Sequence, residues 1–272
     1  MSAASPPAAA GPTTALPEEV VAGLEALLCD ADGNLFPSEE PAFVASAEVT
    51  NRFLADLGSA RRFTAEELRL ATTGMNFRTT SRRLADEAGR PDADLEPWVA
   101  EEKRAVTAHL GEVLRPHAET TAAVTQLAAY LRPAVVSSSA LTRLDACFRA
   151  TGLADVLPAS VRYSAEDSLP VPTSKPDPAV YLHACAQLGI APATGLAVED
   201  SVAGTLSAVR AGCPTVGNLL FVPAAERAER DAALREAGAL AVVASWRELA
   251  DLLLPVLTRR GADPTGGNRW TR

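Results

Sequence analysis

Two aspartates, Asp30 and Asp32, directly follow a short apolar run at residues 26–29. The run is continuous rather than alternating, which is typical of a strand buried on both faces of a parallel sheet. Gly33 and Asn34 after the acids are a turn signal. Because ligands of open α/β sheets bind at the carboxyl ends of the strands, the two acids are positioned for chemistry on a ligand. Solvated acids at an ordinary strand end are the alternative.

Polar side chains also follow two later apolar runs. Ser137 and Ser138 end one of them, and Glu199 and Asp200 end another. The carboxyl ends of parallel strands meet at one edge of a sheet, so we expect these side chains to converge on the two aspartates. A helix cap at Glu199 and a plain strand-end hydroxyl at Ser137 are the alternatives.

Four carboxylates in a small space repel one another unless a cation joins them. A hard ion that prefers oxygen fits such a donor set, and Mg²⁺ is the usual choice when phosphate is the substrate. The sequence therefore predicts a magnesium site formed by Asp30, Asp32, Glu199 and Asp200.

A hydroxyl donor and a fixed positive charge complete the expected site. Ser137, with Ser138 beside it, and Lys175 can hold a phosphoryl group against the metal. One acid of the pair can then attack phosphorus to form an aspartyl-phosphate, while the other protonates the leaving oxygen and later activates water. Lys175 also restrains the charge on the transferring group. A simple helix entry at Lys175, in its Lys-Pro-Asp-Pro stretch, is the alternative.

The composition excludes several classes of protein. The chain has 272 residues, a hydrophobic content of 47% and a net charge of −9, which argues against a nucleic-acid binder. No apolar run approaches the ~20 residues of a membrane span, and the start of the chain lacks a secretory pattern. The cysteines show no CxxC pair, so we expect neither a zinc site nor a disulfide framework. We therefore expect a reducing, cytoplasmic location. They are Cys29, Cys147, Cys185 and Cys213.

The elements that position these residues follow from the apolar pattern. Alternating apolar runs and helical segments at residues 18–36 and 116–258 predict an α/β fold with a parallel sheet covered by helices on both faces. Residues 37–115 have helical spacing throughout, which predicts an inserted all-helical cap domain. Residues 1–17 and 259–272 are expected to be disordered tails.

The cap is expected to select the substrate. Its loop around Gly74, Asn76 and Arg78 is the best candidate to face the active site. Arg78 can bind an anionic or hydroxylated leaving group. A solvated surface arginine is the alternative, since charged residues are mostly exposed.

Four ordered motifs resemble those of the haloacid dehalogenase-like hydrolase superfamily. They are Asp30-Ala31-Asp32-Gly33-Asn34, Val135-Val136-Ser137, Ser174-Lys175-Pro176-Asp177-Pro178 and Val198-Glu199-Asp200-Ser201. The resemblance covers most of residues 24–220 and implies a Rossmann-like core with a helical cap. The subgroup resembles β-phosphoglucomutase and phosphoglycolate phosphatase.

The resemblance also implies individual roles. It makes Asp30 the nucleophile and Asp32 the general acid and base. It implies that Ser137 and Lys175 bind phosphate. The implied ligands of Mg²⁺ are the Asp30 side chain, the Asp32 main-chain carbonyl and Asp200, with Glu199 close by or acting through water.

The chain departs from the family pattern at two places. Asn34 stands where the family usually has threonine, and Pro37-Ser38-Glu39 stands where Asp-Ser-Glu is frequent. Both departures lie outside the core chemistry. They bear on loop geometry and substrate choice rather than on phosphoryl transfer.

The favoured hypothesis is a Mg²⁺-dependent phosphatase acting on a small phosphorylated metabolite, such as a sugar phosphate, as a monomer or homodimer. The first alternative is a phosphomutase of the β-phosphoglucomutase type, which must exclude water and bind a second phosphate in the cap. A non-catalytic binding protein is the third hypothesis. Dehalogenation is disfavoured because it needs no acid at the position of Asp32.

Overall fold

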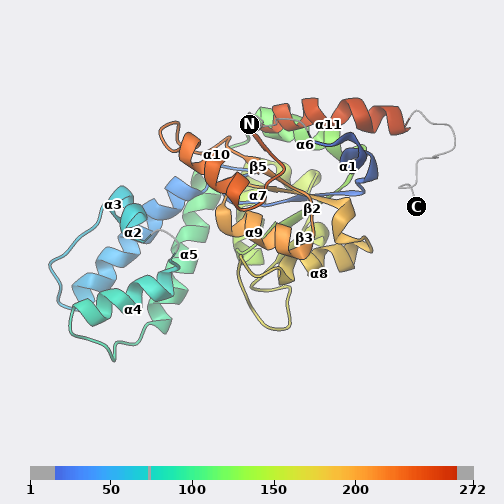
Figure 1. Ribbon diagram of the computed structural model, residues 1–272. Coiled ribbons are helices and arrows are strands. Elements are labelled where there is room, and N and C mark those ends of the chain that lie inside the picture. Colours follow the sequence, from blue (N-terminus) through green and yellow to red (C-terminus); the bar gives the residue numbers. More distant parts are fainter. Residues whose placement is uncertain (1–15, 73–74, 262–272) are drawn as a thin grey trace, which may run out of the picture.

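A six-stranded sheet forms the centre of the protein, in the order β3-β2-β1-β4-β5-β6. The computed structural model describes residues 16–72 and 75–261 (Figure 1). All five neighbouring strand pairs are parallel, as the sequence predicts. The strands are β1 (Ala26–Cys29), β2 (Arg132–Ser137), β3 (Arg162–Ser164), β4 (Gly195–Glu199), β5 (Thr215–Asn218) and β6 (Ala241–Val243).

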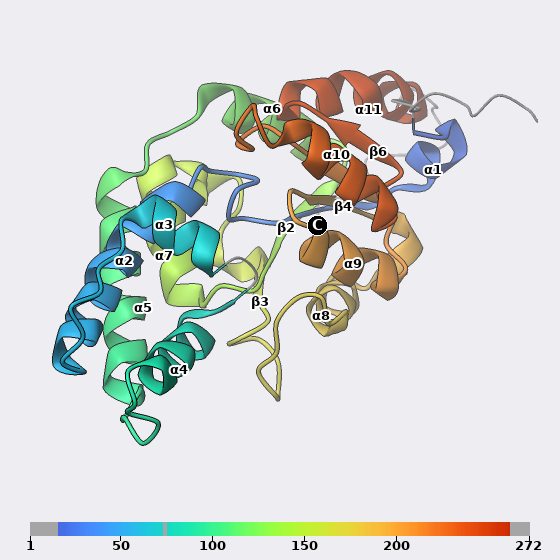
Figure 2. The ribbon, with the colours of Figure 1, turned by 60° about the vertical axis from the view of Figure 1, so that its left-hand side comes forward.

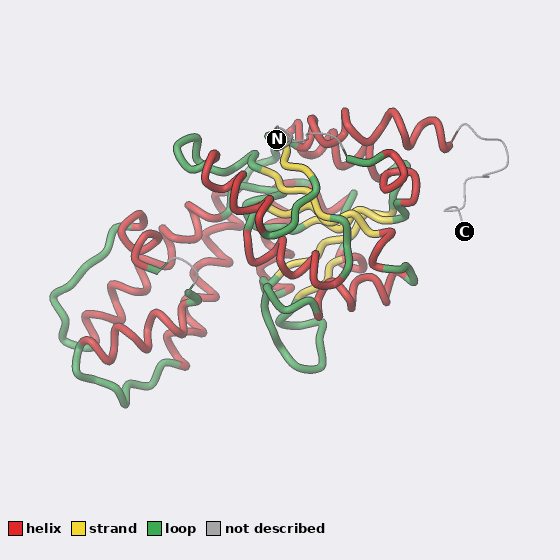
Figure 3. Tube along the Cα trace, in the orientation of Figure 1, coloured by secondary structure: helices red, strands yellow, loops and turns green. Residues whose placement is uncertain are grey.

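Helices cover both faces of this sheet, and the strands lie between them (Figure 3). One face packs on α1 (Glu18–Gly23), α6 (Ala118–Ala128), α7 (Leu141–Thr151) and α11 (Trp246–Gly261). The other packs on α8 (Ala179–Leu188), α9 (Val202–Ala211) and α10 (Arg227–Glu236). The described part of the chain also contains three short 3-10 helices in this domain: η1 (Leu153–Asp155), η2 (Ala159–Val161) and η3 (Pro192–Thr194). The predicted α/β class with a Rossmann-like sheet is confirmed.

β1 lies between β2 and β4, which places its carboxyl end at the centre of the sheet edge. In the register, Cys29 is opposite Val135 on one side and Val198 on the other. Residues on successive positions of a strand point to opposite faces. Both faces of β1 are buried, since Leu27 and Leu28 belong to the cores on opposite sides of the sheet. This explains the continuous apolar run in the sequence.

The insertion after β1 is helical, as predicted. It contains α2 (Glu39–Asp56), α3 (Ala65–Ala71), α4 (Phe77–Glu87) and α5 (Glu96–Val113). These helices enclose their own apolar core and lie together beside the sheet domain (Figures 1 and 2). A capping box starts α3, because Thr64 and Glu67 bond reciprocally there. None of the helices in the described part of the chain is long and apolar enough to cross a membrane.

Several boundaries differ from the sequence predictions. The Asn76 side chain accepts a hydrogen bond from Thr79 N, so α4 begins at Phe77, inside the predicted loop. Helix α11 continues to Gly261, which makes residues 259–261 helical rather than part of a tail. Arg259 pairs with Glu18 in α1, which anchors the end of this helix. Leu16, also assigned to a tail, packs against the core.

Candidate active site

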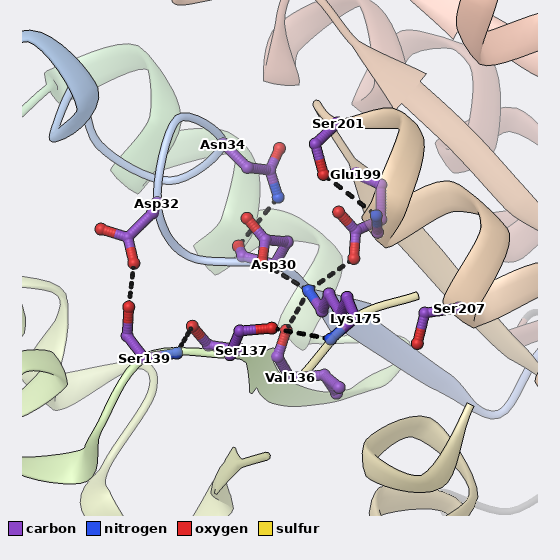
Figure 4. Close-up of polar contacts among 12 residues, drawn as sticks. Asp30, Asp32, Asn34, Val136, Ser137, Ser139, Lys175, Glu199, Ser201 and Ser207 are labelled. Atoms are coloured by element: carbon purple, nitrogen blue, oxygen red, sulfur yellow. Dashed lines mark hydrogen bonds and ion pairs between the residues drawn. The ribbon is translucent and has the colours of Figure 1, made fainter. Parts of the chain in front are cut away.

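The Lys175 ammonium lies between two carboxylates at the carboxyl edge of the sheet (Figure 4). Its Nζ atom is 2.5 Å from Asp30 Oδ1 and 2.6 Å from Glu199 Oε1. It also donates to the main-chain carbonyl of Val136 at 2.8 Å. Asp30 follows β1, Val136 is in β2 and Glu199 ends β4, so three neighbouring strands converge on one cation.

A cluster of carboxylates adjoins this lysine. Asp30, Glu199 and Asp200 each offer an oxygen within 4.8 Å of the others, and all three residues are buried. Gly33 allows this close approach, because its φ of 75° is left-handed and a Cβ there would lie 2.3 Å from Asp200 Oδ2. The turn predicted from sequence therefore needs glycine at position 33 both for its left-handed φ and for the missing Cβ, which leaves room for the Asp200 carboxylate.

Burial dominates the electrostatics of the cluster. It raises the pKa of Asp30 to about 7, although the Lys175 charge opposes the rise. The pKa of Asp200 also lies well above its ordinary value, because of burial and then the charges of Asp30 and Glu199. For Lys175, burial would lower the pKa, but the two paired carboxylates raise it overall. Lys175 pairs with two of the three acids and the Arg230 charge only partly offsets the burial of Asp200, so a further cation would relieve the repulsion among the carboxylates.

The donor set fits Mg²⁺. Glu199 Oε2 is buried without a hydrogen-bond partner among the described residues, whereas Oε1 accepts from Lys175 and Tyr181. A buried carboxylate oxygen without a donor is costly unless a cation approaches it. Carboxylate oxygens are hard ligands of the kind that Mg²⁺ takes, one or two at a time together with water and substrate phosphate. Asp30, Glu199 and Asp200 are therefore the residues that could hold this ion.

The fourth predicted ligand is placed differently. The Asp32 carboxylate turns away from Asp30 and toward Ser139 (Figure 4), and it also contacts Arg143 in α7. It accepts hydrogen bonds from Ser38 Oγ at 2.5 Å and Ser139 Oγ at 2.6 Å, and it pairs with Arg143. Burial would raise the pKa of Asp32, but the Arg143 charge and the two hydroxyls lower it overall. The structure thus brings three of the four predicted metal ligands together and holds the Asp32 side chain outside them.

The two predicted phosphate-binding serines have different surroundings. Ser137 Oγ accepts a hydrogen bond from Ser139 N at 3.0 Å, which leaves its own O–H to donate to a ligand. Ser138 Oγ accepts from Lys175 N at 3.1 Å. Ser138 therefore connects the loop after β2 to the segment that carries Lys175, and this contact helps to position Lys175.

The predicted substrate loop of the cap is only partly described. Gly74 lies outside the described residues. Asn76 caps α4, and Arg78 pairs with Glu96 at the start of α5. The partners of Asn76 and Arg78 lie within the cap itself, so these contacts give both residues structural roles.

Sequence reasoning missed several residues around the site, among them Tyr181, Ser139 and Arg143. The Tyr181 hydroxyl donates to Glu199 Oε1, and Ser139 and Arg143 hold Asp32. Ser139 had a signal, because it continues the run of serines after β2. Tyr181 and Arg143 lie on helices. There, a tyrosine among apolar residues is predicted to be a core residue, and an arginine is predicted to be exposed. Only the packing of α8 and α7 on the sheet reveals their roles.

Two ion pairs connect the cap to loops at the same edge of the core. Arg69 in α3 pairs with Glu226 before α10 at 2.9 Å. Lys103 in α5 pairs with Glu166 in the loop after β3. Both core loops follow strands of the sheet, so the cap contacts the domain at the edge where the acids converge.

Comparisons with known proteins agree with this architecture. The sequence model of the haloacid dehalogenase-like hydrolases matches residues 24–212. A conserved haloacid dehalogenase-like protein of unknown function from Agrobacterium tumefaciens is 25% identical, with a TM-score of 0.66, over 85% of this chain and 98% of that one. No curated protein matches the sequence.

Two further solved structures share the fold. A β-phosphoglucomutase candidate from Thermotoga maritima is 23% identical, with a TM-score of 0.64, over 86% of this chain and 100% of that one. A CbbY variant from Rhodobacter sphaeroides in complex with xylulose-1,5-bisphosphate is 24% identical, with a TM-score of 0.59, over 83% and 96%.

Proposed function

The chain belongs to the haloacid dehalogenase-like hydrolases, and from this premise we propose that it is a Mg²⁺-dependent phosphatase. Its substrate in this proposal is a small phosphorylated metabolite such as a sugar phosphate. One observation carries the proposal. The Asp30 carboxylate is paired with Lys175 and shares a buried cluster with Glu199 and Asp200, so a nucleophile, a fixed cation and metal donors surround one position.

Asp30 acts as the nucleophile in this reaction. One of its carboxylate oxygens attacks phosphorus, the bond to the leaving oxygen breaks, and an aspartyl-phosphate forms. Lys175, only 6% exposed at its side chain, stabilises the negative charge of the transferring phosphoryl group. The Ser137 hydroxyl donates to a phosphoryl oxygen. Bound Mg²⁺ adds positive charge that offsets the charge of the phosphoryl oxygens.

Asp32 supplies the proton chemistry. It protonates the leaving oxygen, then takes a proton from the water that attacks the aspartyl-phosphate, which releases phosphate and restores Asp30. To do so its side chain rotates from Ser139 and Arg143 toward Asp30. The rotation exchanges two serine hydroxyls and the Arg143 guanidinium, which the Asp32 carboxylate now contacts, for a position beside the nucleophile.

The cap contacts of three arginines support hydrolysis over a mutase reaction, in which the aspartyl-phosphate would pass its phosphoryl group to a bound sugar phosphate. A mutase needs cationic groups in the cap for a second phosphate. The three arginines of α4 are instead engaged by cap partners: Arg78 by Glu96, Arg82 by the Pro91 carbonyl and Arg83 by the Ala71 carbonyl. The sugar bisphosphate bound to the Rhodobacter neighbour supports a phosphorylated sugar as the first substrate class to assay.

The deciding variant is Asp30→Asn, which keeps the shape of the side chain but removes the nucleophile. We expect it to abolish hydrolysis of p-nitrophenyl phosphate in the presence of Mg²⁺. Asp56→Asn, at the exposed end of α2, is the matched control and should keep wild-type turnover. Undiminished turnover by Asp30→Asn would refute the nucleophile assignment.

A substrate panel then separates the alternatives. Phosphorylated sugars, polyols and glycolate are each incubated with enzyme and Mg²⁺, and phosphate release is measured. NMR of a hexose phosphate distinguishes isomerisation, which indicates a mutase, from hydrolysis. A wild-type protein that turns over no member of the panel would favour the non-catalytic binding protein.

We also propose a cytoplasmic location for the enzyme. All four cysteines are free and buried, and Cys185 Sγ and Cys213 Sγ lie 3.9 Å apart as thiols. Free thiols are typical of a reducing compartment. We propose a monomer or homodimer, which light scattering of the purified protein will distinguish.

A further inference from the structure

Asn34, the residue that departs from the family pattern, lies fully buried beside the nucleophile. Its side-chain Nδ2 donates to the main-chain carbonyl of Asp30 at 2.9 Å and to that of Val198 at 3.0 Å. Asp30 follows β1 and Val198 is in β4, directly before Glu199. One amide group therefore bridges the ends of the two strands that carry the carboxylate cluster.

A second buried asparagine orients this amide. Asn218, at the end of β5, donates from Nδ2 to Asn34 Oδ1 at 2.8 Å, and its own Oδ1 accepts from Leu220 N. The Trp246 indole donates to the Asn34 main-chain carbonyl at 2.8 Å. Asn34 thus uses both amide protons, its amide oxygen and its carbonyl. Such a fully satisfied buried network holds a single geometry.

The bridge extends the pairing of β1 and β4 beyond its last main-chain bond. Asp30 N donates to Val198 O at 3.0 Å, and the strands carry no further ladder bond toward the site. The Asn34 amide then fixes the Asp30 carbonyl relative to the Val198 carbonyl. A threonine at this position has one hydroxyl proton, so it could donate to only one of the two carbonyls at a time.

We propose that Asn34 and Asn218 are positioning residues that set the spacing between Asp30 and the Glu199–Asp200 pair, and through it the affinity for Mg²⁺. The inference deepens the proposed function and rests on its metal site. Asn34 contacts the main chain of the nucleophile and of the residue before Glu199, while Asn218 acts through Asn34. Residues that orient metal ligands in this way typically contribute a factor of about 10 to 100 to metal affinity.

The experiment is calorimetric titration of Mg²⁺ into metal-free protein, without substrate. Asn218→Ala removes the donor that orients Asn34, and Asn34→Thr removes the two-carbonyl bridge. We expect each to raise the Mg²⁺ dissociation constant about 10-fold. With p-nitrophenyl phosphate at saturating Mg²⁺, we expect kcat to fall while KM stays within about twofold, since the phosphate-binding groups are unchanged.

Asn51→Ala is the matched control. Asn51 is an asparagine of the cap that also makes two main-chain hydrogen bonds, both to Phe63 at 2.8 Å. Its loss should lower the melting temperature without changing the Mg²⁺ dissociation constant. An equal rise in that constant for Asn51→Ala and Asn218→Ala would show general destabilisation and overturn the inference.

Asn218→Ala decides the question even if Asn34→Thr fails to fold. Wild-type Mg²⁺ affinity in folded Asn218→Ala would overturn the positioning role. Failure of the proposed function is a separate result, because it appears as a wild-type protein that binds Mg²⁺ but hydrolyses no phosphate ester. The titration needs no turnover, so it tests the positioning role in that case too.

Discussion

Arg143 Nη2 lies 3.0 Å from Asp32 Oδ1, so the proposed acid of the reaction is paired with a guanidinium. Arg143 is on α7, and Asp32 is in the loop after β1. The pair joins the nucleophile loop to the helix that follows the phosphate-binding serines. It also favours the ionised form of Asp32, whose pKa is lowered although burial opposes this.

The first prediction concerns this pair. Arg143→Ala removes the charge that lowers the pKa of Asp32, so a larger fraction of Asp32 is protonated at neutral pH. For an alkyl phosphate, whose leaving oxygen needs a proton, the basic limb of the kcat/KM pH profile should move to higher pH. Arg149→Ala, an exposed arginine of the same helix, should leave the profile unchanged. An identical profile for Arg143→Ala and wild type would contradict the assignment of Asp32.

The second prediction concerns Tyr181, a fully buried tyrosine of α8. Its hydroxyl donates to the Glu199 oxygen that also accepts from Lys175. Tyr181→Phe removes a hydrogen bond to a buried carboxylate, which should lower the free energy of unfolding by about 2 kcal/mol. Urea unfolding of the metal-free protein measures this loss. Tyr130→Phe, at the edge of the core, should cost less than half as much, and equal losses would argue against a special role for Tyr181.

The third prediction concerns Gly204 in the first turn of α9. A Cβ at this position would lie 1.8 Å from Glu199 Oε2, the oxygen that has no hydrogen-bond partner in the described part of the chain. Gly204→Ala should therefore displace Glu199 or the start of α9 and weaken Mg²⁺ binding, which calorimetric titration measures.

Gly111→Ala is its control, within α5. A Cβ at Gly111 meets the Ala146 Cβ at an ordinary 3.5 Å. Because alanine favours a helix interior over glycine, this variant should be stabilised by about 1 kcal/mol and keep its Mg²⁺ affinity. Gly204→Ala with wild-type affinity would show that the approach to Glu199 is unimportant.

The fourth prediction concerns pH and the metal-free protein. The pKa of Asp30 is raised to about 7, above its ordinary value of 3.8. Between these values the unfolded chain has released the proton that the folded chain keeps, so the Asp30 contribution to stability falls as pH rises from about 4 to 7. Above pH 7 both states are ionised and the contribution is constant.

Asp30→Asn isolates this contribution, because it resembles the protonated acid at every pH. The melting temperature of the wild type minus that of Asp30→Asn should decrease from pH 4 to pH 7 and then level off. Mg²⁺ should raise the wild-type melting temperature more than that of the variant at pH 8. A difference that does not vary with pH would show that burial leaves the Asp30 titration unperturbed.

Much of the fold follows from local pattern. A continuous apolar run predicts a strand buried on both faces, and β1, β2 and β4 all appear where such runs occur. The closeness of Glu199 to Asp30 follows from the rule that parallel strands share a carboxyl edge, whereas Lys175 reaches Asp30 from the loop between β3 and α8, which that rule does not place. Helix starts were less predictable, since α4 begins at Phe77 because of the Asn76 cap.

The amino-acid sequence by itself determined the α/β class, the helical insertion and the set of acids at the sheet edge, because these depend on periodicity and chain order. The tertiary structure alone decided how each side chain is used. Asn34 meets Val198 and Asn218, which are 164 and 184 residues away, through the register of β1, β4 and β5. Asp32 turns from the cluster because α7 brings Arg143 to it. Such contacts depend on packing between distant segments, which no local pattern encodes.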